Sequence, residues 1–484
     1  MSHSPEIISY SPATGAEVGR FPDTCADTIH ELVARAHIAS HHWQAIGFKA
    51  RKTILRTWAH YLAEHLDELA NLVALETGKP VSDAQLEVSV AIDQLSWAAR
   101  NAGRFLQKSH RAPGVLMFNM STHVEYQPFG VIGVIGPWNY PVFTPMGSIA
   151  YALAAGNAVV FKPSEYTPGV GHWLGESFNA IAPQANIFFV ATGGPATGIA
   201  LTNSAINKIA FTGSSATGKK IATTCAQKLT PVLMECGGTD AAIIDKDCNL
   251  ERAAEAVLWG AMANAGQTCV GIERVYVHRD VADIFIEKIS ELASHLVAGR
   301  DYGAITIPKQ IGVIDSHIKD AANRGAQFVV GSADSVQPPF VLPTVMIDAP
   351  EDSLAVAEET FGPTLTIKSV KTIAEAIALT NASQYGLGAS VWSKRNGKAI
   401  ASQLQCGMVS VNSVMAFTAT PSLPFGGVKQ SGYGRIHGRE GLREFTYPRA
   451  VVATRFNVPL NFASFTRSAF VDSFIKRVIK LLNR

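Results

Sequence analysis

The chain has 484 residues, 47% of them hydrophobic and 17% charged, with a formal net charge of +2. This length suffices for roughly two or three domains, and the near-neutral charge excludes the basic surface typical of nucleic-acid-binding proteins. The six cysteines show neither C-x-x-C pairs nor zinc-type spacing, so we expect reduced thiols, no metal site and a cytoplasmic protein. The absence of an apolar leader or a membrane-spanning run adds to this expectation.

Helices come first in the expected order of elements. Residues 28–75 place apolar side chains with a period of about 3.6 residues, which predicts helices that end at Gly78. Short apolar runs then alternate with helical stretches. The runs that we predict as buried strands are 130–136, 157–164, 186–192, 207–214 and 230–236. This alternation indicates a doubly wound, mainly parallel sheet, and it starts again near residue 241, so the expected fold class is α/β with two α/β domains.

The segment Gly213–Lys220, GSSATGKK, differs by one residue from the P-loop pattern G-x-x-x-x-G-K-[ST]. A P-loop needs a hydroxyl at the last place to hold Mg²⁺, and Lys220 cannot bind a cation. A helix that starts here after a strand still presents free backbone N–H groups, which suit a pyrophosphate equally well. From this segment alone, a P-loop NTPase, a dinucleotide site and a glycine-rich turn without a ligand all remain open.

Seven short motifs occur in one order along the chain. They are PWNYP (137–141), FKPSE (161–165), FTGS (211–214), MECGG (234–238), GQTC (266–269), EETFGP (358–363) and PFGGVKQSGYGR (424–435). Together they resemble the aldehyde dehydrogenase superfamily, over roughly residues 10–455. The resemblance implies a non-acylating, NAD(P)-dependent enzyme that oxidises an aldehyde to a carboxylic acid through a cysteine thiohemiacetal and a thioester. It also favours a dinucleotide site at Gly213–Lys220.

The resemblance assigns the catalytic roles to three residues. Cys269 would attack the aldehyde as a thiolate. Asn139 would donate a side-chain hydrogen bond to the oxyanion, with the backbone N–H of Cys269 as the second donor. Glu235, between an apolar strand and a Gly-Gly turn, would activate the water that hydrolyses the thioester. Without the motifs, Cys269 would more often be a buried thiol and Asn139 a turn residue. For Glu235, a capping or salt-bridged carboxylate is the alternative.

The same resemblance implies a cofactor that lies along the carboxyl edge of the sheet. The residues that it assigns to cofactor binding are Pro137, Trp138, Lys162, Ser164, Glu165, Gly213, Ser214, Glu359 and Phe361. A carboxylate beside the adenosine ribose accepts a hydroxyl and repels a phosphate. Glu165 therefore favours NAD, and NADP is the alternative because Lys162 lies beside it.

Apolar and aromatic residues near the motifs suggest an uncharged substrate tunnel. They are Tyr140, Phe143, Val270, Phe417 and Phe425. No Arg stands out as a clamp for a substrate carboxylate, which disfavours the semialdehyde-specific alternative. Glu235 argues against the CoA-acylating alternative, because a hydrolytic base would compete with CoA for the thioester.

Three positions depart from the family pattern. Thr239 replaces the Lys that commonly follows the Gly-Gly turn. Ser148 stands where many members carry Lys in the helix after PWNxP, and Ile436 stands where many carry Glu after SGxGR. The missing Lys–Glu pair argues against a side-chain proton relay from Glu235, which leaves water to carry the proton.

The resemblance also divides the chain into functional parts. The expected parts are a Rossmann-like NAD-binding domain (1–109 and 129–236), a catalytic α/β domain (237–442), bridging β strands (110–128 and 443–456) and a tail (457–484). Bridging strands extend a neighbour's sheet in this family, so we expect a homodimer or homotetramer. The tail reads as a basic amphipathic helix, for which contact with a membrane surface and packing on protein are the two alternatives.

Overall fold

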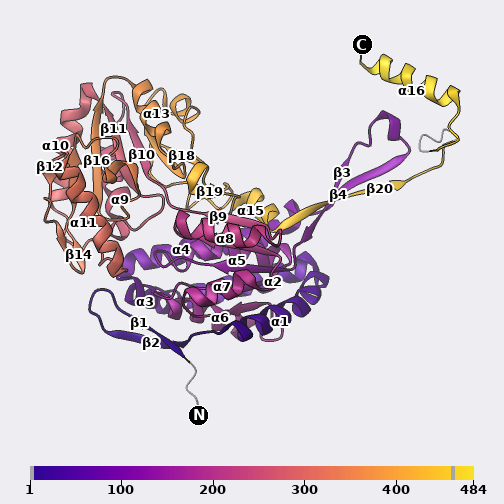
Figure 1. The fold of residues 1–484 in the computed structure, drawn as a ribbon, viewed down its shortest axis with the longest axis horizontal. Coiled ribbons are helices and arrows are strands. Elements are labelled where there is room, and N and C mark those ends of the chain that lie inside the picture. Colours follow the sequence, from indigo (N-terminus) through magenta and orange to yellow (C-terminus); the bar gives the residue numbers. More distant parts are fainter. Residues whose placement is uncertain (1–4, 459–463, 484) are drawn as a thin grey trace.

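The structure is a computed structural model that describes residues 5–458 and 464–483. It contains two helix-covered sheets that lie beside each other and a thin arm of strands that extends away from them (Figure 1). The first strands, β1 (Glu6–Tyr10) and β2 (Glu17–Pro22), form a separate antiparallel hairpin. Within the described residues, no helix has the length and apolar character needed to cross a membrane.

The first sheet has six strands in the order β19-β9-β8-β5-β6-β7. Their bounds are β5 (Val131–Ile135), β6 (Ala158–Lys162), β7 (Phe188–Val190), β8 (Lys208–Thr212), β9 (Val232–Glu235) and β19 (Gly432–Tyr433). All pairings are parallel except that of β19 with β9. β5 and β6 are buried along their whole length, which explains their continuous apolar sequence. All five predicted strands are confirmed.

Helices from the N-terminal half surround this sheet. Their bounds are α1 (Ala26–Ala45), α2 (Gly47–Glu64), α3 (Leu66–Thr77), α4 (Val81–Phe105), α5 (Phe143–Ala155), α6 (Pro168–Ile181), α7 (Pro195–Asn203) and α8 (Ser215–Ala226). Gly78 adopts φ 81° and ends α3, as the sequence predicted. Ser214 caps α8 by accepting a hydrogen bond from the Thr217 N–H at 3.3 Å.

The second sheet has seven strands in the order β12-β15-β16-β11-β10-β17-β18. The strands are β10 (Asp240–Ile244), β11 (Ile272–His278), β12 (Gln327–Val330), β15 (Thr344–Ile347), β16 (Thr364–Val370), β17 (Gly388–Trp392) and β18 (Met408–Val411). The helices of this part are α9 (Leu250–Met262), α10 (Ala282–Ser294), α11 (Pro308–Asn323), α12 (Leu354–Ala357), α13 (Ile373–Ala382) and α14 (Gly397–Ala401). Only β12 runs antiparallel to its neighbour, so the sheet is mainly parallel.

The chain then returns to the first sheet. β19 pairs with β9, and α15 (Gly438–Glu444) lies against α5 and α4. Residues 432–444 therefore pack with the first sheet, although the expected division assigned residues up to 442 to the second domain. This return places Arg435 and Ile436 beside the end of β9.

The arm consists of β3 (Ser109–Arg111), β4 (Met120–Pro128) and β20 (Thr446–Thr454). β4 and β20 pair antiparallel over their whole length, from Pro128 opposite Thr446 to Met120 opposite Thr454. The two segments expected as bridging strands thus do form strands, and they pair with each other. α16 (Ala469–Leu482) lies beyond the arm, away from both sheets (Figure 1).

Candidate active site

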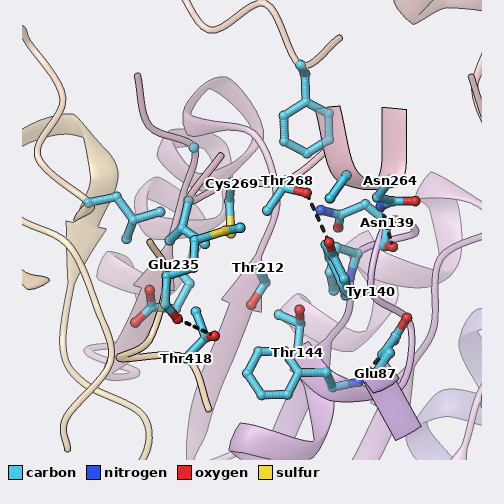
Figure 2. A pocket seen from close by; sticks show the side chains of 18 of the residues that line it. Glu87, Asn139, Tyr140, Thr144, Thr212, Glu235, Asn264, Thr268, Cys269 and Thr418 are labelled. Atoms are coloured by element: carbon cyan, nitrogen blue, oxygen red, sulfur yellow. Dashed lines mark hydrogen bonds between the residues drawn. The ribbon is translucent and has the colours of Figure 1, made fainter. Parts of the chain in front are cut away.

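A cavity of about 440 Å³ opens where β5, β8 and β9 end, and residues from both sheet regions line it. Figure 2 shows Cys269 and Glu235 near each other in this cavity, with Asn139 across from them. The three predicted catalytic residues, far apart in sequence, thus share one space. The carboxyl ends of parallel strands are where such folds place their ligands.

The loop that carries Cys269 is held in an unusual backbone conformation. Asn264 and Ala265 are left-handed, with φ of 54° and 56°. A Cβ at Gly266 would lie 1.9 Å from a backbone carbonyl oxygen, so no larger residue fits there. Gln267 is fully buried, and its side-chain amide makes three hydrogen bonds of 2.8–3.2 Å to backbone groups. These constraints fix the position of the Cys269 thiol.

The surroundings of Cys269 keep it protonated in the resting protein. Burial raises the pKa of the Cys269 thiol, and the negative charges of Glu359, Asp240 and Glu235 raise it further. The thiolate therefore forms only when a base takes its proton.

Glu235 is the last residue of β9 and is buried. Among the described residues, neither of its carboxylate oxygens has a hydrogen-bond partner. Burial raises the pKa of Glu235 well above its usual value, an effect that the Arg435 charge opposes and the Glu444 charge reinforces. An unpaired carboxylate with a raised pKa is a strong general base once it is ionised.

Asn139 lies beside the loop of Cys269 and is held at both ends. Its side-chain amide donates a hydrogen bond of 2.8 Å to the Gln267 carbonyl, which leaves the second amide hydrogen for another acceptor. Its own carbonyl accepts hydrogen bonds from Lys79 Nζ at 2.8 Å and from Asn264 Nδ2 at 3.1 Å. The amide is therefore a fixed donor, as an oxyanion site requires.

The predicted substrate residues separate into two groups. Tyr140, Phe143, Val270 and Phe425 line the cavity, whereas Phe417 does not. The Phe417 ring lies behind Phe425, with 6.5 Å between ring centroids. The Tyr140 hydroxyl is within hydrogen-bond distance of the Thr268 hydroxyl, at 3.0 Å.

The predicted cofactor residues also lie in two places. Pro137, Trp138, Gly213, Ser214, Glu359 and Phe361 line the same cavity as the catalytic residues. Lys162, Ser164 and Glu165 follow β6, the strand next to β5, and Lys162 Nζ donates to Glu165 Oε2 at 3.3 Å. They therefore lie at the same sheet edge, outside the cavity lining.

These residues fit a dinucleotide. The first turn of α8 carries no acidic residue, so its free N–H groups are available to a pyrophosphate. A Cβ at Gly237 would lie 2.1 Å from a Glu359 carboxylate oxygen, so the absence of a side chain there keeps this side of the cavity open. Trp138 and Phe361 meet edge to face in the cavity lining, with 5.5 Å between ring centroids. A bound nicotinamide would supply the hydride acceptor.

Glu273 is a site residue that sequence reasoning missed. It is buried in β11, and its carboxylate accepts hydrogen bonds from the N–H groups of Thr360 (3.1 Å) and Phe361 (2.9 Å). Burial raises the pKa of Glu273 to about 7. A Glu inside an apolar strand, GIERVYVH, was the only signal, and it does not reveal its partners. Glu273 holds the turn that carries Phe361.

Comparison with known proteins agrees with this geometry. The model of the aldehyde dehydrogenase family matches residues 1–451. The 4,4'-diapolycopene aldehyde oxidase of Methylomonas sp is 34% identical, over 94% of this chain and 87% of the relative. The NADP-dependent succinate-semialdehyde dehydrogenase of Escherichia coli (strain K12) is also 34% identical, over 90% and 92%. A crystal structure titled as an E. coli NADP-dependent enzyme has a TM-score of 0.89 at 33% identity, covering 93% of this chain and 95% of its own.

A cysteine, a buried carboxylate and a fixed amide donor line one cavity, an arrangement that suits covalent catalysis. The chain belongs to the aldehyde dehydrogenase family. It is an NAD(P)-dependent enzyme that oxidises an aldehyde to a carboxylic acid. The fold class predicted from the alternating strands and helices is confirmed, and the P-loop NTPase alternative is not supported.

Proposed function

We propose that Cys269, Asn139 and Glu235 carry out this oxidation. The thiolate of Cys269 adds to the aldehyde carbon, and the resulting oxyanion accepts hydrogen bonds from Asn139 and from the backbone N–H of Cys269. Each such donor is typically worth about 3 kcal/mol. When the oxyanion collapses, hydride leaves the carbon for the cofactor and a thioester remains on Cys269.

Glu235 then takes a proton from water, which attacks the thioester and releases the carboxylic acid and the thiol. The observation that carries this proposal is the unpaired, buried carboxylate of Glu235 in the same cavity as Cys269. The same carboxylate argues against transfer of the acyl group to CoA. Ile436 lines the cavity where the family pattern has Glu, so water is left to carry the proton outward.

We propose that the substrate is an uncharged aldehyde. Lys79 is the only Lys or Arg among the residues that line the cavity, and it is fully buried and paired with Glu87. Acidic side chains outnumber basic ones in this lining, and they are Asp83, Glu87, Glu235 and Glu359. Behind Phe143 and Phe425, burial lowers the pKa of His437 to about 3, so this wall is neutral. A substrate carboxylate would therefore meet no free cation.

The two relatives named above differ in this respect. Succinate semialdehyde carries a carboxylate, whereas 4,4'-diapolycopene aldehyde is an uncharged hydrocarbon aldehyde. Leu86 and Trp259 line the cavity and are about half exposed, so its entrance is apolar. This entrance suits a hydrocarbon chain.

A panel of aldehydes tests the substrate class. We expect kcat/KM for octanal or benzaldehyde to exceed that for succinate semialdehyde by about tenfold or more, the equivalent of about 1.4 kcal/mol. With each aldehyde of the panel, kcat/KM should be higher with NAD than with NADP. Lys162 donates a hydrogen bond to Glu165, and the Glu165 carboxylate would repel a 2′-phosphate. A higher kcat/KM for the semialdehyde would overturn the uncharged class and support the semialdehyde-specific alternative.

We propose that the arm joins subunits into a homodimer or homotetramer. β20 forms one edge of the three-stranded sheet, with nine residues of backbone along that edge. Val452 on β20 is 63% exposed, and the contacting rings of Phe118 and Phe456 at the arm are each about half exposed, so the arm presents apolar surface of the kind that a partner subunit covers. Light scattering at micromolar concentration should give a multiple of 51.7 kDa; a monomeric mass would refute the proposal.

We propose that α16 lies on an anionic membrane surface. Phe470 and Leu481 are 70% and 75% exposed, and Lys476, Arg477 and Lys480 are exposed on the same helix. Such a helix can bury its apolar face in the headgroup region while its cations contact anionic lipid. The free thiols of all six cysteines fit the cytoplasmic location that we also propose. Arg484 lies outside the described residues.

Vesicle sedimentation tests the role of α16. The full chain should sediment with phosphatidylglycerol-containing vesicles and much less with phosphatidylcholine alone, and added salt should weaken binding. Deleting residues 467–484, or replacing Phe470 and Leu481 with Ser, should abolish sedimentation, whereas Ile199→Ser, an exposed apolar residue on α7, should not. Equal binding by the truncated protein would exclude the membrane role. A change in the number of subunits per assembly on truncation would indicate that α16 packs on a partner subunit.

A further inference from the structure

A buried ion pair lies in the cavity wall without belonging to the reacting groups. Lys79 follows Gly78 at the end of α3, and Glu87 lies in α4; Lys79 Nζ and Glu87 Oε2 are 2.6 Å apart. Both side chains are fully buried. Removing two charges from water costs several kcal/mol per ion unless other hydrogen bonds compensate. The identity of those other partners therefore indicates what the pair does.

Among the residues that the structure describes, the other hydrogen-bond and ring partners of these two side chains lie in one short segment, residues 139–143. Lys79 Nζ donates to the Asn139 carbonyl at 2.8 Å and lies 4.0 Å from the centroid of the Tyr140 ring. Glu87 Oε1 accepts hydrogen bonds from the N–H groups of Val142 at 2.8 Å and Phe143 at 3.2 Å.

This segment leads into α5. α5 starts at Phe143 without a side-chain cap of its own, so the Glu87 carboxylate takes the place of the missing cap. Lys79 holds the other end of the segment, at Asn139. The two residues together fix the loop between the end of β5 and the start of α5.

We propose that Lys79 and Glu87 are positioning residues of the oxyanion site, which rests on the role of Asn139 proposed above. A donor must stay within about 0.5 Å of its productive position to stabilise a developing charge. The side-chain amide of Asn139 is placed by its backbone, and Lys79 is the charged group bound to that backbone. Lys79 thus acts on the reaction through Asn139, without contact with the aldehyde.

A double-mutant cycle between Lys79 and Asn139 tests this. We expect Lys79→Met to slow single-turnover NADH formation, measured with enzyme in excess over aldehyde, by about 10- to 100-fold, which is at most the loss from removing one oxyanion donor. The aldehyde KM and the NAD dissociation constant should stay within about twofold of their unchanged values. A slower chemical step with unchanged binding distinguishes a positioning role from a loosened fold, which would weaken binding as well. In the Asn139→Ala background, Lys79→Met should cause at most about a twofold further loss, because its target is already absent.

The matched control is Arg51, another buried cation, which donates to the carbonyls of Trp43 and, at the far end of α5, Ala154. Whatever loss Arg51→Met causes should multiply with that of Asn139→Ala. If Lys79→Met does not fold, Glu87→Gln replaces it in the cycle, because the amide oxygen still accepts the α5 N–H groups while the charge that holds Lys79 is lost.

The outcomes separate the two proposals. Fully multiplicative losses for Lys79→Met and Asn139→Ala would overturn the positioning role while leaving the oxyanion role of Asn139 in place. An unchanged single-turnover rate in Asn139→Ala would instead overturn that oxyanion role, and the positioning role with it.

Discussion

Cys269→Ala is expected to abolish aldehyde oxidation, lowering kcat/KM by roughly four orders of magnitude or more. Without the thiolate no covalent adduct forms, so the carbon has no oxyanion from which to expel hydride. The change removes only the sulfur from a loop that Gln267 holds in place, so the fold should persist. NADH formation at saturating aldehyde measures the loss, and calorimetric titration should show NAD affinity within about threefold of the unchanged protein, because none of the residues predicted to bind the cofactor is changed.

A second cysteine provides the control for this variant. Cys248 precedes α9, does not line the cavity, and, like Cys269, has a pKa raised by burial, here to about 11. Cys248→Ala should therefore retain activity. Wild-type turnover by the Cys269 variant would show that the nucleophile lies elsewhere.

Local sequence patterns were sufficient to predict the first sheet. β5, β6 and β8 are buried along nearly their whole length, so an apolar run without alternation identified each of them. The return of residues 432–444 to that sheet could not be predicted in the same way. The pairing of Gly432 with Glu235 joins residues almost 200 positions apart, and no local pattern encodes such a contact.

The candidate site, too, could be predicted only in part from local sequence patterns. Motifs identified Cys269 and Glu235 because each stands in a short loop of distinctive composition. Lys79 and Glu273 escaped notice, because their roles depend on hydrogen bonds to Asn139, 60 residues away, and to Phe361, 88 residues away. Phe417 was expected in the tunnel because it stands near a motif, but proximity in sequence does not say which side of Phe425 a ring occupies.

Glu235→Gln is expected to separate the two halves of the reaction. Oxidation to the thioester should survive, because the loss of the Glu235 charge removes one of the negative charges that raise the Cys269 pKa. Hydrolysis of the thioester should fall by roughly a hundredfold or more, the usual contribution of a general base. Stopped-flow absorbance should show a burst of about one NADH per active site, followed by slow turnover. Unchanged steady-state turnover would place the base elsewhere.

The pH dependence gives this variant a second readout. The raised pKa of Glu235 means that the basic carboxylate appears only as pH rises through that value, so the steady-state rate of the unchanged protein should increase with pH. Gln does not titrate, so the steady-state rate of Glu235→Gln should lose this pH dependence. Its burst should still accelerate with pH as Cys269 ionises.

Glu76 is the control for this variant. It is buried with a raised pKa but lies outside the cavity lining, and its carboxylate accepts hydrogen bonds from the N–H groups of Gly169 and Val170. Glu76→Gln should show no burst and should keep the pH dependence; a burst there would mean that loss of any buried carboxylate stalls the enzyme, and the assignment of Glu235 as the base would fail.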